Sequence, residues 1–147
     1  MAEPGASALF FGNISDASWN LSERPLLLII SPVAYQGEVS ARITILTPSF
    51  EADRAKLLNV PGMDVTYVAW QEDADPYTVA VEALPPSSRG PIYVDGMTRH
   101  FIVDGFEKVE PGLSVLSAPL AITSLRERKS PSEIALLKCA NEVCPVW

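Results

Sequence analysis

The sequence predicts an α/β domain built on a mixed β-sheet of about six strands, with helices on both faces of the sheet. Two observations support this prediction. Apolar runs of strand length follow one another closely in the first third of the chain, which favours antiparallel neighbours. Farther along, strand-like runs alternate with helix-like segments, which is typical of crossover units with parallel pairing. Neither an internal repeat nor a low-complexity segment interrupts this order.

The expected strands are short apolar runs bounded by turn residues. The run at 26–31 is continuous and ends at Pro32, as in a strand buried on both faces. The runs at 41–47 and 65–70 alternate in side-chain character, as in half-covered strands. The complete set of expected strands is 9–11, 26–31, 41–47, 65–70, 91–94 and 113–117.

Three helices are expected between these strands. Thr47 followed by Pro48 predicts a cap and first turn for a helix reaching about Leu58, and Asp75-Pro76 predicts the same kind of start. The second of these helices is expected to stop at Pro85-Pro86. The third is expected over 98–107, although Gly105 weakens its helical character.

Length and charge exclude several classes of protein. With 147 residues, 48% of them apolar, the chain is long enough for one domain with a real core. A net charge of −7 argues against nucleic acid and against an anionic membrane surface as partners. The chain contains no apolar run long enough to span a bilayer, and residues 1–7 do not resemble a signal peptide, so we expect a cytoplasmic protein.

The segment at 124–143 predicts an amphipathic helix. Ser130, Pro131 and Glu133 are spaced as an N-cap, a first helical residue and the acidic member of a capping box. An apolar stripe follows, and Pro145 prevents the helix from continuing. The stripe consists of Ile134, Leu137 and Ala140, with Leu136 and Val143 beside them. Such a helix needs a surface to lie on, so we expect it to connect to a partner domain.

The pattern Leu-Arg-x-x-Lys-Ser-x-x-Glu-Ile-x-x-Leu-x-x-Ala-Asn, over residues 125–141, resembles a junction in the creatinase/prolidase/aminopeptidase P family. In that family the junction joins an N-terminal α/β domain to a C-terminal "pita-bread" metallopeptidase domain. The segments 9–13 and 24–30 resemble the family's first two strands. The resemblance implies a ribonuclease H-like N-terminal domain over 1–123, with a linker and the start of the connector helix over 124–147. One departure is Cys144-Pro145-Val146-Trp147, which does not continue the helix.

The same resemblance implies a function. The chain would be the non-catalytic N-terminal domain of a metal-dependent Xaa-Pro dipeptidase or aminopeptidase, shaping substrate access and dimerisation. Its partners would be the catalytic domain of the same parent and a second copy of the protein. Two divalent metals, manganese, cobalt or zinc, would belong to that catalytic domain, and no catalytic or metal-binding residue to this chain. Trp19 and His100 are the candidates for facing the substrate cleft, against the plainer alternatives of a lid over the core edge and a surface histidine.

Two other functions stay open. Relatives that lack the metal ligands act as protein-binding modules, and this chain would then bind a protein partner. The other alternative is a small phosphatase-like enzyme, because the strand before Asp95-Gly96-Met97-Thr98 resembles the strand of aspartyl-phosphate phosphatases that ends in the nucleophile. Met97 stands where those enzymes need a general acid, so an Asp-Gly turn is the plainer interpretation. Cys139, Cys144 and the single histidine are too few for a zinc site of about four ligands.

Overall fold

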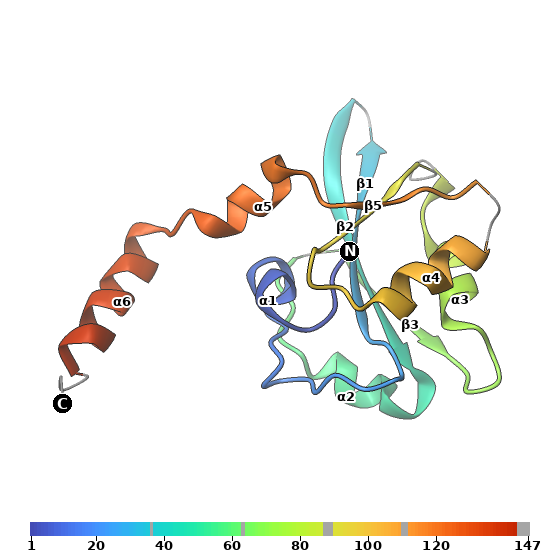
Figure 1. Cartoon of the computed structure of the whole chain (residues 1–147), viewed down its shortest axis with the longest axis horizontal. Coiled ribbons are helices and arrows are strands. Elements are labelled where there is room, and N and C mark those ends of the chain that lie inside the picture. Colours follow the sequence, from blue (N-terminus) through green and yellow to red (C-terminus); the bar gives the residue numbers. More distant parts are fainter. Residues whose placement is uncertain (36, 63, 87–89, 110–111, 144–147) are drawn as a thin grey trace.

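The computed structural model describes residues 1–35, 37–62, 64–86, 90–109 and 112–143 (Figure 1). The strands in this part of the chain are β1 (Leu27–Tyr35), β2 (Glu38–Pro48), β3 (Val65–Trp70), β4 (Ile92–Val94) and β5 (Val115–Ser117). The helices are α1 (Ala6–Gly12), α2 (Ala52–Lys56), α3 (Pro76–Ala83), α4 (His100–Val109), α5 (Leu120–Glu127) and α6 (Pro131–Val143), and a 3-10 turn, η1 (Ser49–Glu51), precedes α2.

The strands form two small sheets. One has three strands in the order β1-β2-β3 and the other pairs β4 with β5. As predicted, the early pair β1–β2 is antiparallel, while β2–β3 and β4–β5 are parallel. The expectation of about six strands is wrong for the described residues, which form sheets of three and two strands.

The first expected strand, at 9–11, is a helix instead. Ser7, Ala8 and Gly12 are buried while Leu9 and Phe10 are exposed, which is the spacing of a helix face and not the alternation of a strand. At Gly12 an added Cβ would come within 2.9 Å of the Leu28 methyl groups, so glycine lets α1 lie directly on β1. A run of only three apolar residues carries too little periodicity to separate the two structures.

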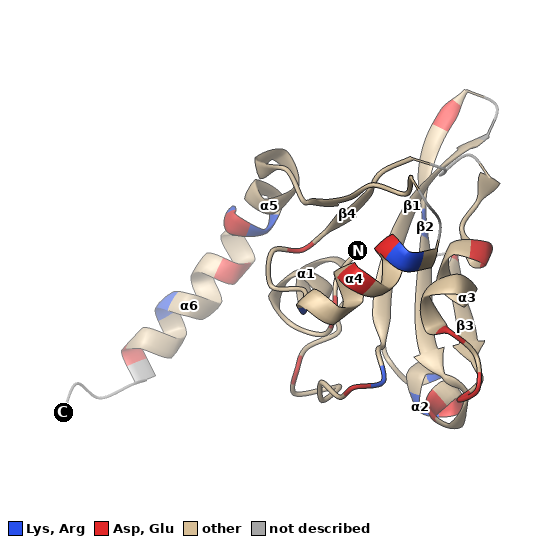
Figure 2. Ribbon diagram, turned by 45° about the vertical axis from the view of Figure 1, so that its right-hand side comes forward, with Lys and Arg blue, Asp and Glu red and all other residues tan. Residues whose placement is uncertain are grey.

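Helices cover both faces of the three-stranded sheet, as predicted. Alternate residues of β1 and β2 point to opposite sides and bury into two separate clusters. The cluster on the α1 and α2 side contains Ala2, Ala8, Ile14, Trp19, Leu26, Leu28, Ile43, Ile45 and Ala55. The cluster on the α3 and α4 side contains Leu27, Ile29, Leu46, Trp70, Ala80, Ile102 and Phe106. Charged residues lie mainly on the helices and loops around this core (Figure 2).

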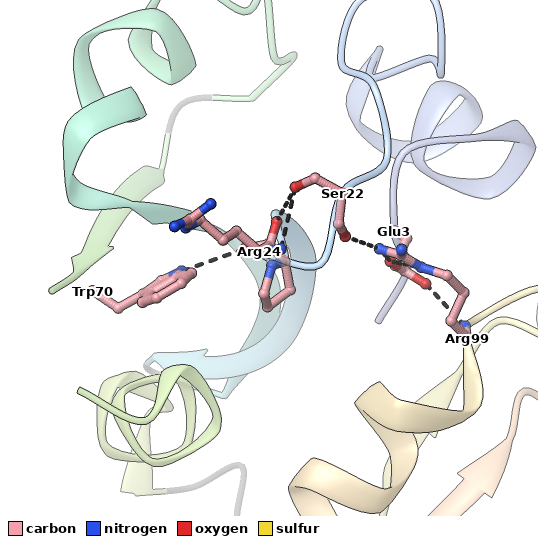
Figure 3. Close-up of polar contacts among 6 residues, drawn as sticks. Glu3, Ser22, Arg24, Trp70 and Arg99 are labelled. Carbon is pink, nitrogen blue, oxygen red and sulfur yellow. Dashed lines mark hydrogen bonds and ion pairs between the residues drawn. The ribbon is translucent and has the colours of Figure 1, made fainter. Parts of the chain in front are cut away.

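An ion pair fastens the first residues of the chain to the start of α4. The side chain of Glu3 is only 6% exposed and accepts three bonds from Arg99, two from its guanidinium at 2.9 and 2.6 Å and one from its backbone N–H at 2.9 Å. The same guanidinium donates to the carbonyl oxygen of Ser22 at 2.7 Å (Figure 3). Nearby, the indole N–H of Trp70 donates to the carbonyl oxygen of Pro25 at 3.3 Å. These bonds hold the loop before β1 to the start of α4 through Ser22 and to the end of β3 through Pro25.

One of the two helix caps expected after the early strands is present in the structure. Asp75 caps α3 as predicted, because its carboxylate accepts the N–H of Thr78 at 2.9 Å. The expected cap at Thr47 is wrong: β2 continues through Pro48, and Thr47 is fully buried opposite Ala69 of β3. Because residues through Pro48 pair with β3, the α-helix α2 begins only at Ala52.

We call α5 and α6 together the arm, which extends away from the rest of the molecule (Figure 1). The predicted capping box of α6 is confirmed: Ser130 N–H donates to Glu133 at 2.8 Å, and Glu133 N–H donates to the Ser130 hydroxyl at 3.2 Å. The predicted domain boundary at residue 124 falls inside α5 and stays a prediction. The predicted helix stop at Pro145 lies outside the described residues, and in the described part no helix has both the length and the apolar character to cross a membrane.

Candidate functional site

Trp19, a predicted cleft residue, lies in the loop between α1 and β1. Its side chain is 2% exposed and belongs to the core on the α1 and α2 side. The Arg54 guanidinium of α2 covers the ring, with its Cζ 4.2 Å from the ring centroid. The ring thus fastens this loop to the core, and a role beside a cleft formed with another domain stays a prediction.

His100, the other predicted cleft residue, is the exposed first residue of α4. It lies one turn before Asp104, which forms an ion pair with Lys108. The hydrogen bond from Lys108 is the main cause that lowers the pKa of Asp104, and the charges of Lys108 and His100 contribute to the same shift. Trp19 packs with the face that α1 and α2 cover, whereas α4 lies on the other face, so the structure does not bring the two candidates together. The role of His100 at a cleft stays a prediction.

Asp95 forms the turn that the plainer interpretation predicts. One carboxylate oxygen accepts the hydroxyl of Ser7 at 2.7 Å, and the other accepts the N–H of Met97 at 3.3 Å. Its carbonyl oxygen accepts the N–H of Thr98 at 2.9 Å. The carboxylate therefore holds the chain leaving β4 against α1. The hydrogen bonds account for Asp95 without a nucleophilic role.

The described residues contain no group of three or more His, Cys, Asp or Glu side chains that could hold a metal ion. Cys139 is a free, exposed thiol on α6. No reaction step is assigned to these residues, and the two divalent metals expected in a catalytic domain of the parent stay a prediction.

The arm carries an exposed apolar surface. Leu120 of α5 is 75% exposed and Leu136 of α6 is 71% exposed. Ile134 and Leu137 of α6 are also exposed, whereas the partly exposed Ile122 and Leu125 of α5 also line a cavity of the domain. A protruding surface with this many uncovered apolar side chains is typical of a site that contacts another protein surface.

A cavity of about 550 Å³ opens between β1 and β4. Its walls are apolar, with Ala80 and Phe106 on the α3 and α4 side and Phe11 and Ile122 on the α1 and α5 side. Its polar lining includes Met1 and the hydrogen-bonded pair Ser7 and Asp95. Sequence reasoning missed this cavity, because strands far apart in the chain form it and no local motif marks it.

Fold and geometry together define a class: an α/β domain with an apolar cavity, an exposed helical arm and, over the described residues, no metal-ligand cluster. Several solved structures share this fold. Among them are a proline dipeptidase from Streptococcus pneumoniae (TM-score 0.60, 14% identity, 87% of this chain and 85% of that one), a proline dipeptidase from Streptococcus agalactiae (TM-score 0.56, 15% identity, 83% and 82%), and a Creatine_N superfamily domain of a dipeptidase from Streptococcus thermophilus (TM-score 0.51, 14% identity, 86% and 84%).

The chain therefore has the fold of these dipeptidase domains, as the resemblance to the creatinase/prolidase family predicts. At the level of sequence, it is 39% identical over 141 residues to an uncharacterized peptidase of Schizosaccharomyces pombe. That match covers 95% of this chain, which spans only 30% of the relative's length. No model of a protein family matches the chain.

Proposed function

We propose that this chain is the non-catalytic N-terminal domain of a metal-dependent Xaa-Pro dipeptidase or aminopeptidase. The fold shared with proline dipeptidases and the sequence match to a peptidase more than three times as long support the proposal. The described residues supply no metal-ligand cluster, so the metals and the bond-breaking chemistry would belong to a catalytic domain of the same parent. Two divalent ions, manganese, cobalt or zinc, are the expected metals there.

The observation that carries this proposal is the exposed arm. A helix with a well-formed capping box but uncovered Leu136 and Leu137 gains little stability from its own domain. In the proposed parent these side chains lie on the catalytic domain, and the α/β domain then limits which peptides reach the metals. Trp19 and His100 are the candidates for the cleft, and homodimer contacts are the other role proposed for this domain.

The test compares peptidase activity on an Xaa-Pro dipeptide with manganese for this chain alone and for the full-length protein that contains it. We expect hydrolysis only by the full-length protein. Turnover by this chain alone would overturn the assignment of a non-catalytic domain. A full-length protein that stays inactive with each of the three metals would refute the dipeptidase and favour the alternative of a protein-binding module.

A second measurement examines the arm in the full-length protein. Leu137→Glu places a charge on the surface proposed to contact the catalytic domain, whereas Lys138→Glu changes the charge of an exposed neighbour in the same helix. We expect the first variant to lower kcat/KM and thermal stability much more than the second. Equal effects of the two variants would refute the proposed contact.

A further inference from the structure

The cavity between β1 and β4 has the size and the walls of a small-molecule site. Its volume is about 550 Å³, and sites of this kind enclose about 300–1,000 Å³. Phe11 of α1 and Phe106 of α4 line it from opposite faces of the sheet, together with the aliphatic side chains of Leu28 and Ile122. An apolar molecule that enters the cavity therefore exchanges water for contact with apolar side chains.

Ser7 of α1 and Asp95, directly after β4, bring polar atoms into this lining. The Ser7 hydroxyl donates to Oδ1 of Asp95 at 2.7 Å, and the backbone N–H of Met97 donates to Oδ2 at 3.3 Å. A serine hydroxyl has one proton and an ionised carboxylate has none, so the proton of Ser7 is already used. The positions left on both side chains are oxygen lone pairs. A ligand group that binds to this pair must therefore be a hydrogen-bond donor.

The charge of Asp95 adds a second requirement. Among the described residues, no lysine, arginine or histidine side chain forms an ion pair with it. The Met1 amine donates to the Tyr93 carbonyl at 2.6 Å, and burial lowers the pKa of this amine while the charge of Asp95 acts in the opposite direction. Burial thus favours the neutral amine and leaves the Asp95 carboxylate incompletely neutralised. A ligand that brings a positive charge gains from this field.

Other kinds of ligand fit the lining less well. An anion would be repelled by Asp95 and would find no free donor on the Ser7 and Asp95 side chains. A purely apolar molecule would cover these oxygen atoms without replacing the water that they lose, which costs free energy. A positively charged donor on an apolar body avoids both costs.

We propose that this cavity binds a small organic amine, with its apolar body between Phe11 and Phe106 and its ammonium group donating to Ser7 and Asp95. The contact with Asp95 is a charge-assisted hydrogen bond, which is about twice as strong as a neutral one. An aromatic body suits the two phenylalanine rings, because rings pack favourably edge-on or offset. The site is separate from the peptidase activity proposed above, since no bond of the ligand is broken.

The experiment titrates the complete 147-residue chain with 2-phenylethylamine and follows the amide chemical shifts by NMR. Three matched probes each change one property: 2-phenylethanol removes the charge, 3-phenylpropionate reverses it, and ethylamine removes the ring. We expect 2-phenylethylamine to bind saturably, with shifts at Ile30 and Phe106 in the lining and none at Asp53 of α2. It should bind about tenfold tighter than 2-phenylethanol, and neither 3-phenylpropionate nor ethylamine should bind saturably.

Two substitutions test the assigned contacts. Asp95→Asn removes the charge but keeps the shape of the side chain, so affinity for 2-phenylethylamine should fall about tenfold while affinity for 2-phenylethanol stays the same. Ala118→Phe fills the cavity and should abolish binding of both probes. Ala121→Phe is its matched control, because Ala121 is exposed on α5 outside the lining, and it should leave binding unchanged. Ala118→Phe retains Asp95, so the site is tested even if Asp95→Asn does not fold.

Four results would overturn the proposal. The first is the absence of saturable binding by 2-phenylethylamine. The second and third are equal affinities of the unaltered chain for this amine and 2-phenylethanol, or for this amine and 3-phenylpropionate. The fourth is binding of the amine that persists in a folded Ala118→Phe variant, which would place the probe outside the cavity.

Discussion

Gly105 lies inside α4 because the ring of Tyr77 occupies the space that a side chain would need. A Cβ added there would lie 2.5 Å from the Tyr77 Cδ2 atom and closer still to Cε2 and Cζ. The ring is also held by Phe106, with centroids 5.1 Å apart in an edge-on arrangement. We therefore predict that Gly105→Ala destabilises the protein, although alanine is the better helix former.

The size of the effect follows from three opposing contributions. In an open helix the change would stabilise by about 1 kcal/mol. Forcing the ring aside costs about 1–3 kcal/mol, and weakening its contact with Phe106 adds about 0.5–1.5 kcal/mol. The expected net destabilisation is about 0.5–3.5 kcal/mol, or several degrees in melting temperature for a chain of 147 residues.

The assay is urea unfolding of a double-mutant cycle with Tyr77→Ala. Without the ring, Gly105→Ala should change sign and stabilise by about 1 kcal/mol. Gly96→Ala is the matched control, since an added Cβ there meets nothing within 4 Å. Stabilisation by Gly105→Ala in the wild-type background, or the same effect in both backgrounds, would refute the reasoning.

Three further predictions concern the described contacts. Arg99→Ala leaves the buried carboxylate of Glu3 without its guanidinium partner and should lower the free energy of unfolding by about 2–4 kcal/mol. This is less than for a fully buried pair, because Arg99 is partly exposed. An unchanged midpoint of urea unfolding would contradict this. Burial, with help from Asp75, raises the pKa of Tyr77 to about 12. Because the folded-state pKa lies above the unfolded one, stability is intact below about pH 10 and falls as the pH rises towards 12; Tyr77→Phe should flatten that fall, and an unaltered slope would speak against the shift. Ser130→Ala removes a cap of α6 and should lower helical circular dichroism without moving the main unfolding transition; loss of global stability would show that the arm is part of the core.

Local signals in the sequence predicted the structure well. Asp75 and the pair Ser130 and Glu133 cap helices as expected, because a cap depends only on residues within one turn. The antiparallel and parallel pairs also follow from the spacing of elements along the chain. Gly105 is the instructive exception, since the helix tolerates it for a reason that lies on α3.

Long-range pairing could not be predicted in the same way. Thr47 has the chemistry of a cap, yet pairing with β3 keeps it in a strand. Trp19 packs in the core and lies under Arg54 of α2, and no local pattern indicates either contact. The cavity depends on Met1 meeting Tyr93, which is 92 positions away in sequence. Periodicity alone carries no information about such partners.

The bonds from Met1 to Tyr93 and from Glu3 to Arg99 also bear on the order in which the protein folds. Met1 and Tyr93 are 92 positions apart in sequence and Glu3 and Arg99 are 96 apart, whereas β1 and β2 are neighbours in sequence. These two contacts close far longer loops than the hairpin does, and the entropy cost of closure grows with loop length. A loss of either contact should therefore loosen the connection between the two small sheets before it opens the hairpin itself.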